Sequence, residues 1–115
     1  MGVVEDQEFI KAFNSQACQI HDIAVSKGWC EKERNVGELI ALMHSELSEA
    51  LESQRHGDPP NDQIPAFSGV EVEMADCIIR IMDAAVEKGW RVGEALVAKV
   101  AFNKTRPYRH GNKNF

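Results

Sequence analysis

The segment LIALMHSELSEALE, residues 39–52, decides the fold of this chain. Its apolar residues recur at steps of three and four, which is the spacing of one face of an α-helix. Two acids, Glu46 and Glu49, stand one helical turn apart at the border of that face. A second pair with the same step, Glu73 and Asp76, follows in the sequence EVEMAD. The segment therefore predicts a helix whose acids lie beside its packing face.

Four helical segments are predicted from the same apolar spacing. They cover about residues 6–27, 36–56, 68–88 and 92–104. Gly28 and Gly89 are expected to end the first and third helices, and Asn35 is expected to cap the second. No segment alternates like a strand, so the predicted fold class is all-α. We expect a bundle of four to five helices over residues 1–105, followed by a basic tail over residues 106–115.

The composition favours a globular protein in the cytoplasm. The 115 residues fit one domain, and 43% of them are hydrophobic while 27% are charged. No stretch approaches the roughly 20 apolar residues of a membrane span, and the start MGVVEDQEF lacks the pattern of a signal peptide. We therefore expect no membrane association. The three cysteines lack CxxC spacing, and we expect Cys18 and Cys77 in the core.

Charge is distributed unevenly along the chain. Residues 99–115 contain five basic side chains and no acid, whereas the first 98 residues contain eight basic and eighteen acidic side chains. A body this acidic repels a long phosphate backbone, while the basic end attracts anions. We expect a small phosphorylated ligand and no polymeric nucleic acid.

The four acids Glu46, Glu49, Glu73 and Asp76 predict a metal site if the second and third helices pack antiparallel. Anions crowded in a partly dry seam repel one another, and a bound cation offsets this repulsion. A set of carboxylates without His or Cys at matching spacing favours Mg²⁺, with Mn²⁺ or Ca²⁺ possible, over zinc. The alternative is a non-catalytic helical interaction module whose acids are solvated surface charge.

Three features together resemble the MazG-like nucleoside triphosphate pyrophosphohydrolases, an all-α family. They are Arg34-Asn35 before residues 39–52, the Glu-x-x-Asp pair of the third helix, and the ending KVAFNKTRPYRHGNKNF. The resemblance covers about residues 28–115 and implies a MazG-like bundle. It also implies hydrolysis of (deoxy)nucleoside triphosphates to monophosphate and pyrophosphate, which clears unwanted nucleotides. Many members have a further Glu where this chain has Ser45, so the number of metal ions stays open. A phosphoribosyl-ATP-type substrate is an alternative.

The resemblance also implies roles for individual residues. The four acids would be the catalytic and Mg²⁺-binding residues, with Glu49 as our choice of proton acceptor. The phosphate-binding residues are expected near the C-terminus: Lys99, Asn103, Arg106, Arg109 and Lys113. Arginine is suited to this role because it binds phosphate oxygens with two parallel hydrogen bonds.

A base and sugar pocket is expected around Trp29, His21 and Asp83. An indole offers a flat face on which any base can stack, and Asp83 lies one heptad after Asp76. The alternatives are helix-end packing for Trp29, a hydrogen-bonded structural role for His21, and a surface position near Lys88 for Asp83.

Assembly is expected to complete the core. The apolar residues exceed what a helix pair with two short partners can bury, and we expect a homodimer or a homotetramer.

Overall fold

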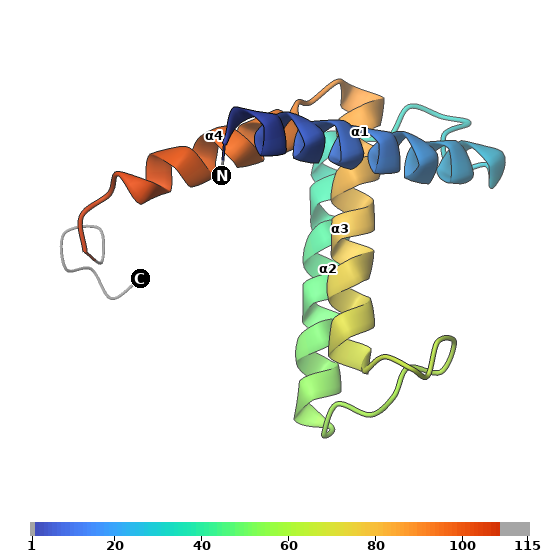
Figure 1. Cartoon of the computed structure of the whole chain (residues 1–115). Helices are drawn as coiled ribbons and strands as arrows, with labels where there is room; N and C mark the ends of the chain where they lie inside the picture. Colours follow the sequence, from blue (N-terminus) through green and yellow to red (C-terminus); the bar gives the residue numbers. More distant parts are fainter. Residues whose placement is uncertain (1, 109–115) are drawn as a thin grey trace.

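The protein is a four-helix structure, shown by a computed structural model that describes residues 2–108 (Figure 1). Its helices are α1 (Val3–Ser26), α2 (Val36–Arg55), α3 (Gly69–Lys88) and α4 (Val92–Lys104). No strand occurs within the described range, which confirms the all-α prediction. The first helix begins at Val3 rather than near Asp6, and the other bounds lie within about one residue of those predicted.

The helix ends follow from local sequence. The Asn35 side chain accepts a hydrogen bond of 3.2 Å from the backbone N–H three residues later, which caps α2 as predicted. A capping box formed by Ser68 and Glu71 starts α3. Gly28 and Gly89 follow the ends of α1 and α3 with φ of +86° and +72°, a left-handed backbone that glycine adopts without a steric cost.

The helices form a hairpin with a crossing pair at one end. The antiparallel α2 and α3 run side by side, α1 lies across the end of the hairpin, and α4 extends from there along and beyond α1 (Figure 1). The start of α4 comes close to α1 at Gly93, where an added Cβ atom would lie only 2.9 Å from the Phe13 ring. The absence of a side chain at Gly93 therefore permits this crossing.

The buried core is small and lies mainly where α1 meets the hairpin. Its hydrophobic members are Ala17, Leu39, Ala50, Val72, Cys77, Met82, Ala84 and Ala85. The prediction for Cys77 is confirmed, whereas that for Cys18 is wrong, because Cys18 is exposed. Ala17 faces the core, and the next residue of a helix points about 100° away from it.

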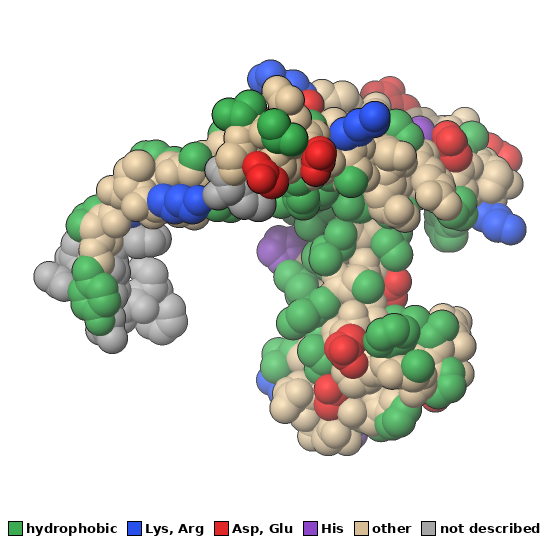
Figure 2. Space-filling model, in the orientation of Figure 1, with side chains coloured by type: hydrophobic (Ala, Val, Ile, Leu, Met, Phe, Trp, Pro, Cys, Tyr) green, Lys and Arg blue, Asp and Glu red, His purple; other side chains and the backbone are tan. Residues whose placement is uncertain are grey.

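The hairpin leaves a second apolar face uncovered. Its side chains are between 43% and 52% exposed: Ile40, Leu47, Leu51, Met74 and Ile78. The space-filling view likewise shows hydrophobic side chains on the open surface along the hairpin (Figure 2). The radius of gyration is 16.7 Å, whereas a compact domain of this length has about 13 Å. A single chain is therefore extended, with much apolar surface in contact with water.

Within residues 2–108, no helix is long and apolar enough to cross a membrane.

Candidate functional site

Four acids from α2 and α3 meet in one place. Carboxylate oxygens of Glu46, Glu49 and Glu73 all lie within 4.8 Å of one another. Asp76, one turn after Glu73, lies outside this group of three but is near enough to help raise the pKa of Glu73. Glu46 is buried, Glu73 and Asp76 are partly buried, and Glu49 is exposed. The antiparallel hairpin thus brings the two sequence pairs together at the edge of its seam.

The crowding changes the protonation of one of these acids. A hydrogen bond with Glu49, loss of solvation and the negative charges of Glu49 and Glu46 raise the pKa of Glu73 to about 8. In the absence of a metal, the crowding therefore favours a proton shared between Glu73 and its neighbour Glu49. A site with excess negative charge and only oxygen donors fits a hard divalent cation such as Mg²⁺.

Arg80 offsets part of this negative charge. Its Nε donates a hydrogen bond of 3.1 Å to Oε1 of Glu46. Arg80 lies one turn after Asp76 on α3 and was not singled out from the sequence. The signal that could have revealed it is a lone basic residue in the apolar sequence CIIRIMDAAV. A charged residue among apolar ones on a packed helix generally has a partner.

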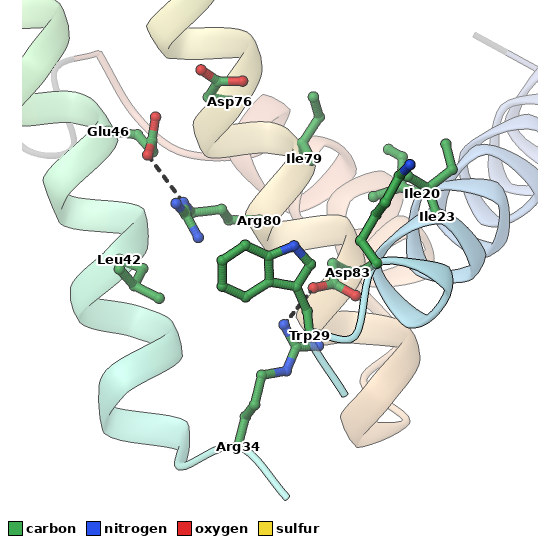
Figure 3. Close-up of a pocket in the computed structure, with 12 residues that line it drawn as sticks. Ile20, Ile23, Trp29, Arg34, Leu42, Glu46, Asp76, Ile79, Arg80 and Asp83 are labelled. Carbon is green, nitrogen blue, oxygen red and sulfur yellow. Dashed lines mark hydrogen bonds and ion pairs between the residues drawn. The ribbon is translucent and has the colours of Figure 1, made fainter. Parts of the chain in front are cut away.

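A pocket of about 470 Å³ begins beside Glu46 and Asp76 and ends at the junction of the hairpin with α1. Glu49 and Glu73 line a separate hollow beside the loop that joins α2 to α3. Its walls include apolar side chains of three helices, among them Ile20, Ile23, Leu42 and Ile79. Figure 3 shows Glu46 and Asp76 at one end, Arg34 and Asp83 at the other, and Trp29 between them. The pocket therefore has apolar walls, charged side chains at both ends, and the cation Arg80 between Glu46 and the indole.

Trp29 lines this pocket with its side chain largely in water. It is 69% exposed, so it does not pack in the core. An indole at a pocket mouth is available for stacking against a flat ligand. Trp90 lines a different hollow, between α1 and the start of α4, and lies away from the acids.

Asp83 is the centre of a polar network at the far end of the pocket. It is buried, it lies 2.8 Å from Nδ1 of His21, and it accepts a 2.7 Å hydrogen bond from Nη1 of Arg34. Burial alone would raise the pKa of Asp83, but the hydrogen bonds with Arg34 and His21 outweigh it and lower the pKa. The alternative of a surface acid near Lys88 is wrong, because Asp83 is buried and its partners are His21 and Arg34.

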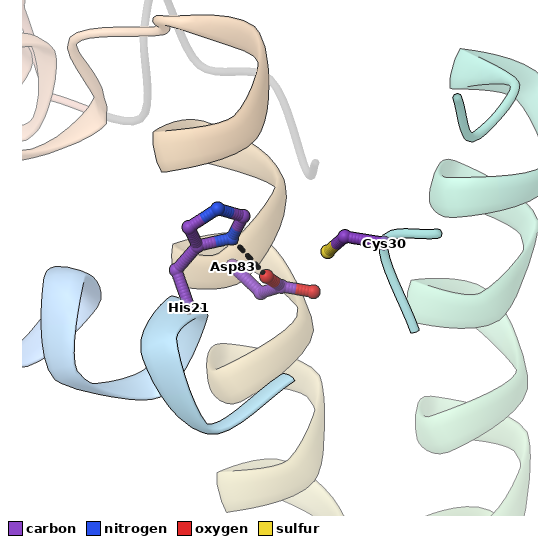
Figure 4. A group of neighbouring side chains, drawn as sticks. All are labelled: His21, Cys30 and Asp83. Atoms are coloured by element: carbon purple, nitrogen blue, oxygen red, sulfur yellow. Dashed lines mark hydrogen bonds and ion pairs between the residues drawn. The ribbon is translucent and has the colours of Figure 1, made fainter. Parts of the chain in front are cut away.

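His21 and Asp83 also lie close to Cys30, as Figure 4 shows. His, Cys and Asp are all metal ligands, but this group is a poor cation site. Asp83 already forms an ion pair with Arg34. Burial together with a hydrogen bond to Glu87 raises the pKa of the Cys30 thiol. A protonated thiol is a weak ligand. We interpret the group as a hydrogen-bonded network that fixes the pocket wall.

The expected phosphate-binding residues that lie within residues 2–108 do not meet the acids in a single chain. Lys99 and Asn103 are exposed on α4, which points away from the hairpin (Figure 1). The cationic groups of Lys99 and Arg106 instead lie 4.8 Å and 5.8 Å from the centre of the Phe102 ring. Arg109 and Lys113 are outside the described residues.

Comparison of the chain with known protein families, with curated proteins and with solved structures finds no match in any of the three.

Proposed function

We propose that the protein is a Mg²⁺-dependent nucleoside triphosphate pyrophosphohydrolase that removes unwanted nucleotides. One observation supports this proposal: two of the four neighbouring acids, Glu46 from α2 and Asp76 from α3, line a pocket that also has an exposed indole. A nucleotide has a charged phosphate end and a flat apolar base, which match the two parts of this pocket. The sequence resemblance to the MazG-like family supports the same activity.

The acids have the chemistry that Mg²⁺ requires. In this proposal Glu46, Glu49, Glu73 and Asp76 hold the ion, and Mn²⁺ is an acceptable substitute because it also prefers oxygen ligands. The bound ion would neutralise phosphate charge and lower the pKa of a water molecule. Metal binding would favour loss of the proton that the crowded carboxylates share in the metal-free state.

The chain's own residues then serve the hydrolysis in separate roles. Water adds to the α-phosphorus, the bond from that phosphorus to the bridging oxygen breaks, and pyrophosphate leaves with the electron pair. Glu49 is our choice to accept the proton of the water, because it is the one exposed member of the four acids and can pass the proton on to solvent. Trp29 would stack on the base, and the network of Asp83 would fix the pocket wall.

We also propose that a homodimer or homotetramer completes the phosphate site. In one chain α4 holds Lys99 and Asn103 away from the acids (Figure 1). The same helix exposes Leu96, Val100 and Phe102, each between 44% and 52%. If these apolar side chains pack against the uncovered face of another hairpin, the cations of α4 come near the partner's acids. Such packing would also bury the apolar surface that a single chain leaves in contact with water.

The direct test is pyrophosphate release from a panel of canonical and modified nucleoside triphosphates with Mg²⁺. We expect release from at least one (deoxy)nucleoside triphosphate. Glu46→Gln and Asp76→Asn should each lower turnover by on the order of a hundredfold or more, since each removes charge that stabilises the transition state.

The matched control is Glu38→Gln, which removes an exposed acid from the first turn of α2, the helix that carries Glu46. This variant should keep the turnover of the wild type. Unaltered turnover in both Glu46→Gln and Asp76→Asn would refute the proposed site. If no nucleotide releases pyrophosphate and Mg²⁺ does not raise the melting temperature, the non-catalytic module is the better description.

A further inference from the structure

Arg80 joins the acidic cluster to the pocket. Among residues 2–108, it is the one Lys or Arg side chain in an ion pair with any of the four acids. It also lines the pocket beside Trp29, and Figure 3 shows its guanidinium between Glu46 and the indole. Arg80 therefore contacts one proposed metal ligand, Glu46, and also lines the space proposed for the nucleotide.

The two partners of this ion pair differ in their freedom to move. The side chain of Glu46 is 9% exposed, whereas that of Arg80 is 40% exposed. A buried carboxylate without a cation is costly, so Glu46 needs a partner whether or not a metal is bound. A half-exposed arginine loses little by leaving, because water and other anions can replace its partner. The arginine is thus the exchangeable member of the pair.

A divalent cation and a guanidinium compete for the same oxygens. Glu46 cannot satisfy both at full strength, since two positive charges a few ångströms apart repel each other. Binding of an ion to the carboxylates would therefore favour release of the guanidinium into the pocket. There its planar fork of donors matches phosphate oxygens.

We propose that Arg80 is an exchangeable counter-ion, which neutralises Glu46 in the metal-free protein and moves to the α-phosphate of the nucleotide once the metal is bound. This inference rests on the proposed function for its second half. The α-phosphate is the group that adjoins the sugar, so it lies between the metal-bound phosphates and a base stacked on Trp29. Arg80 occupies that intermediate place.

The proposal predicts opposite effects of one substitution on two ligands. Arg80→Met removes a competitor of the metal, so Mg²⁺ should bind about three- to tenfold more tightly in calorimetric titration of the metal-free protein. The same variant loses charged hydrogen bonds to the substrate, so kcat/KM should fall by about tenfold or more. Its melting temperature should drop without Mg²⁺ and recover to that of the wild type at saturating Mg²⁺.

Two further variants separate charge from geometry. Arg80→Lys keeps the positive charge but not the fork, so its Mg²⁺ affinity should stay near that of the wild type while kcat/KM falls. It also gives a second reading if Arg80→Met does not fold. The matched control is Arg55→Met, which removes a cation from an exposed pair with Glu52 on the same hairpin. Its Mg²⁺ affinity should change by less than about twofold.

The results that would refute the role of Arg80 differ from those that would refute the proposed pyrophosphohydrolase activity. Unchanged or weaker Mg²⁺ binding by Arg80→Met would show that Arg80 does not compete for Glu46. Tighter Mg²⁺ binding with an unchanged kcat/KM would remove the phosphate role. A wild-type protein that binds Mg²⁺ but hydrolyses no nucleotide would refute the proposed function alone, and the Mg²⁺ titration would still decide the exchange at Glu46.

Discussion

At the scale of single residues, the main feature is the raised pKa of Glu73, which is caused by the nearby carboxylates of α2 when no cation is bound. Glu73 is held close to Glu49, which raises its pKa from 4.5 to about 8. The folded protein therefore binds a proton that the unfolded chain has already lost between these two values. By linkage, the contribution of Glu73 to stability is fully present below about pH 4.5 and is lost as the pH rises to about 8.

This linkage predicts the behaviour of Glu73→Gln in the absence of metal. The variant and the wild type should have similar free energies of unfolding at about pH 5. Toward about pH 9 the variant should become the more stable of the two, because Gln carries no charge to repel Glu49. Urea unfolding in the presence of a chelator at several pH values measures the difference. A difference that does not change with pH would mean that the carboxylates are farther apart in solution.

At the scale of elements, the N-terminal cap of α3 fixes the position of the turn that precedes the acid Glu73. Ser68 accepts a 3.2 Å hydrogen bond from the N–H of Glu71, and the Glu71 side chain accepts one of 2.9 Å from the N–H of Ser68. Asp58 adds a 2.8 Å hydrogen bond from the N–H of Val70. These contacts fix the first turn of α3, and Glu73 follows immediately after that turn.

The cap therefore has a testable energy. Ser68→Ala should lower the free energy of unfolding by about 1 kcal/mol, because one N–H of the first turn loses its acceptor. Ser68→Asp retains an acceptor and should stay close to the wild type. Chemical denaturation of the metal-free protein measures both, and equal stability of all three proteins would contradict the observed capping box.

At the scale of the whole molecule, the arrangement separates the cations of α4 from the acids of the hairpin. The two groups can meet in an assembly in which each chain supplies one of them. The uncovered apolar faces supply a driving force for such an assembly, because burial of apolar surface is the main favourable term in association.

A mixing experiment tests this arrangement. Glu46→Gln and the double variant Lys99→Met with Arg106→Met should each be inactive alone. After unfolding and refolding together, random pairing into dimers should restore about a quarter of wild-type activity, since half the dimers are mixed and each of those has one intact site. If wild-type protein regains its activity after the same refolding but the mixture of variants does not, the acids and the cations of one site belong to the same chain. Light scattering of the wild type should give a dimer or a tetramer.

Several features were readable from the sequence because they depend on near neighbours. Apolar spacing and end residues such as Asn35 and Gly89 determined the four helices and their bounds. The three-residue step placed Glu46 with Glu49, and Glu73 with Asp76, on one helix face each. Helical geometry repeats every 3.6 residues, so positions within two turns can be related without knowledge of the fold.

Other features were decided only by the tertiary structure, because they join residues far apart in the chain. The packing of α2 on α3 put Arg80 against Glu46, and the approach of α1 put His21 against Asp83. The direction of α4 kept Lys99 away from the acids, which no local pattern encodes. The sequence by itself determined which elements exist and which acids they carry. The crossing of those elements decided which charges meet, since a contact between distant residues depends on how helices pack and not on their spacing along the chain.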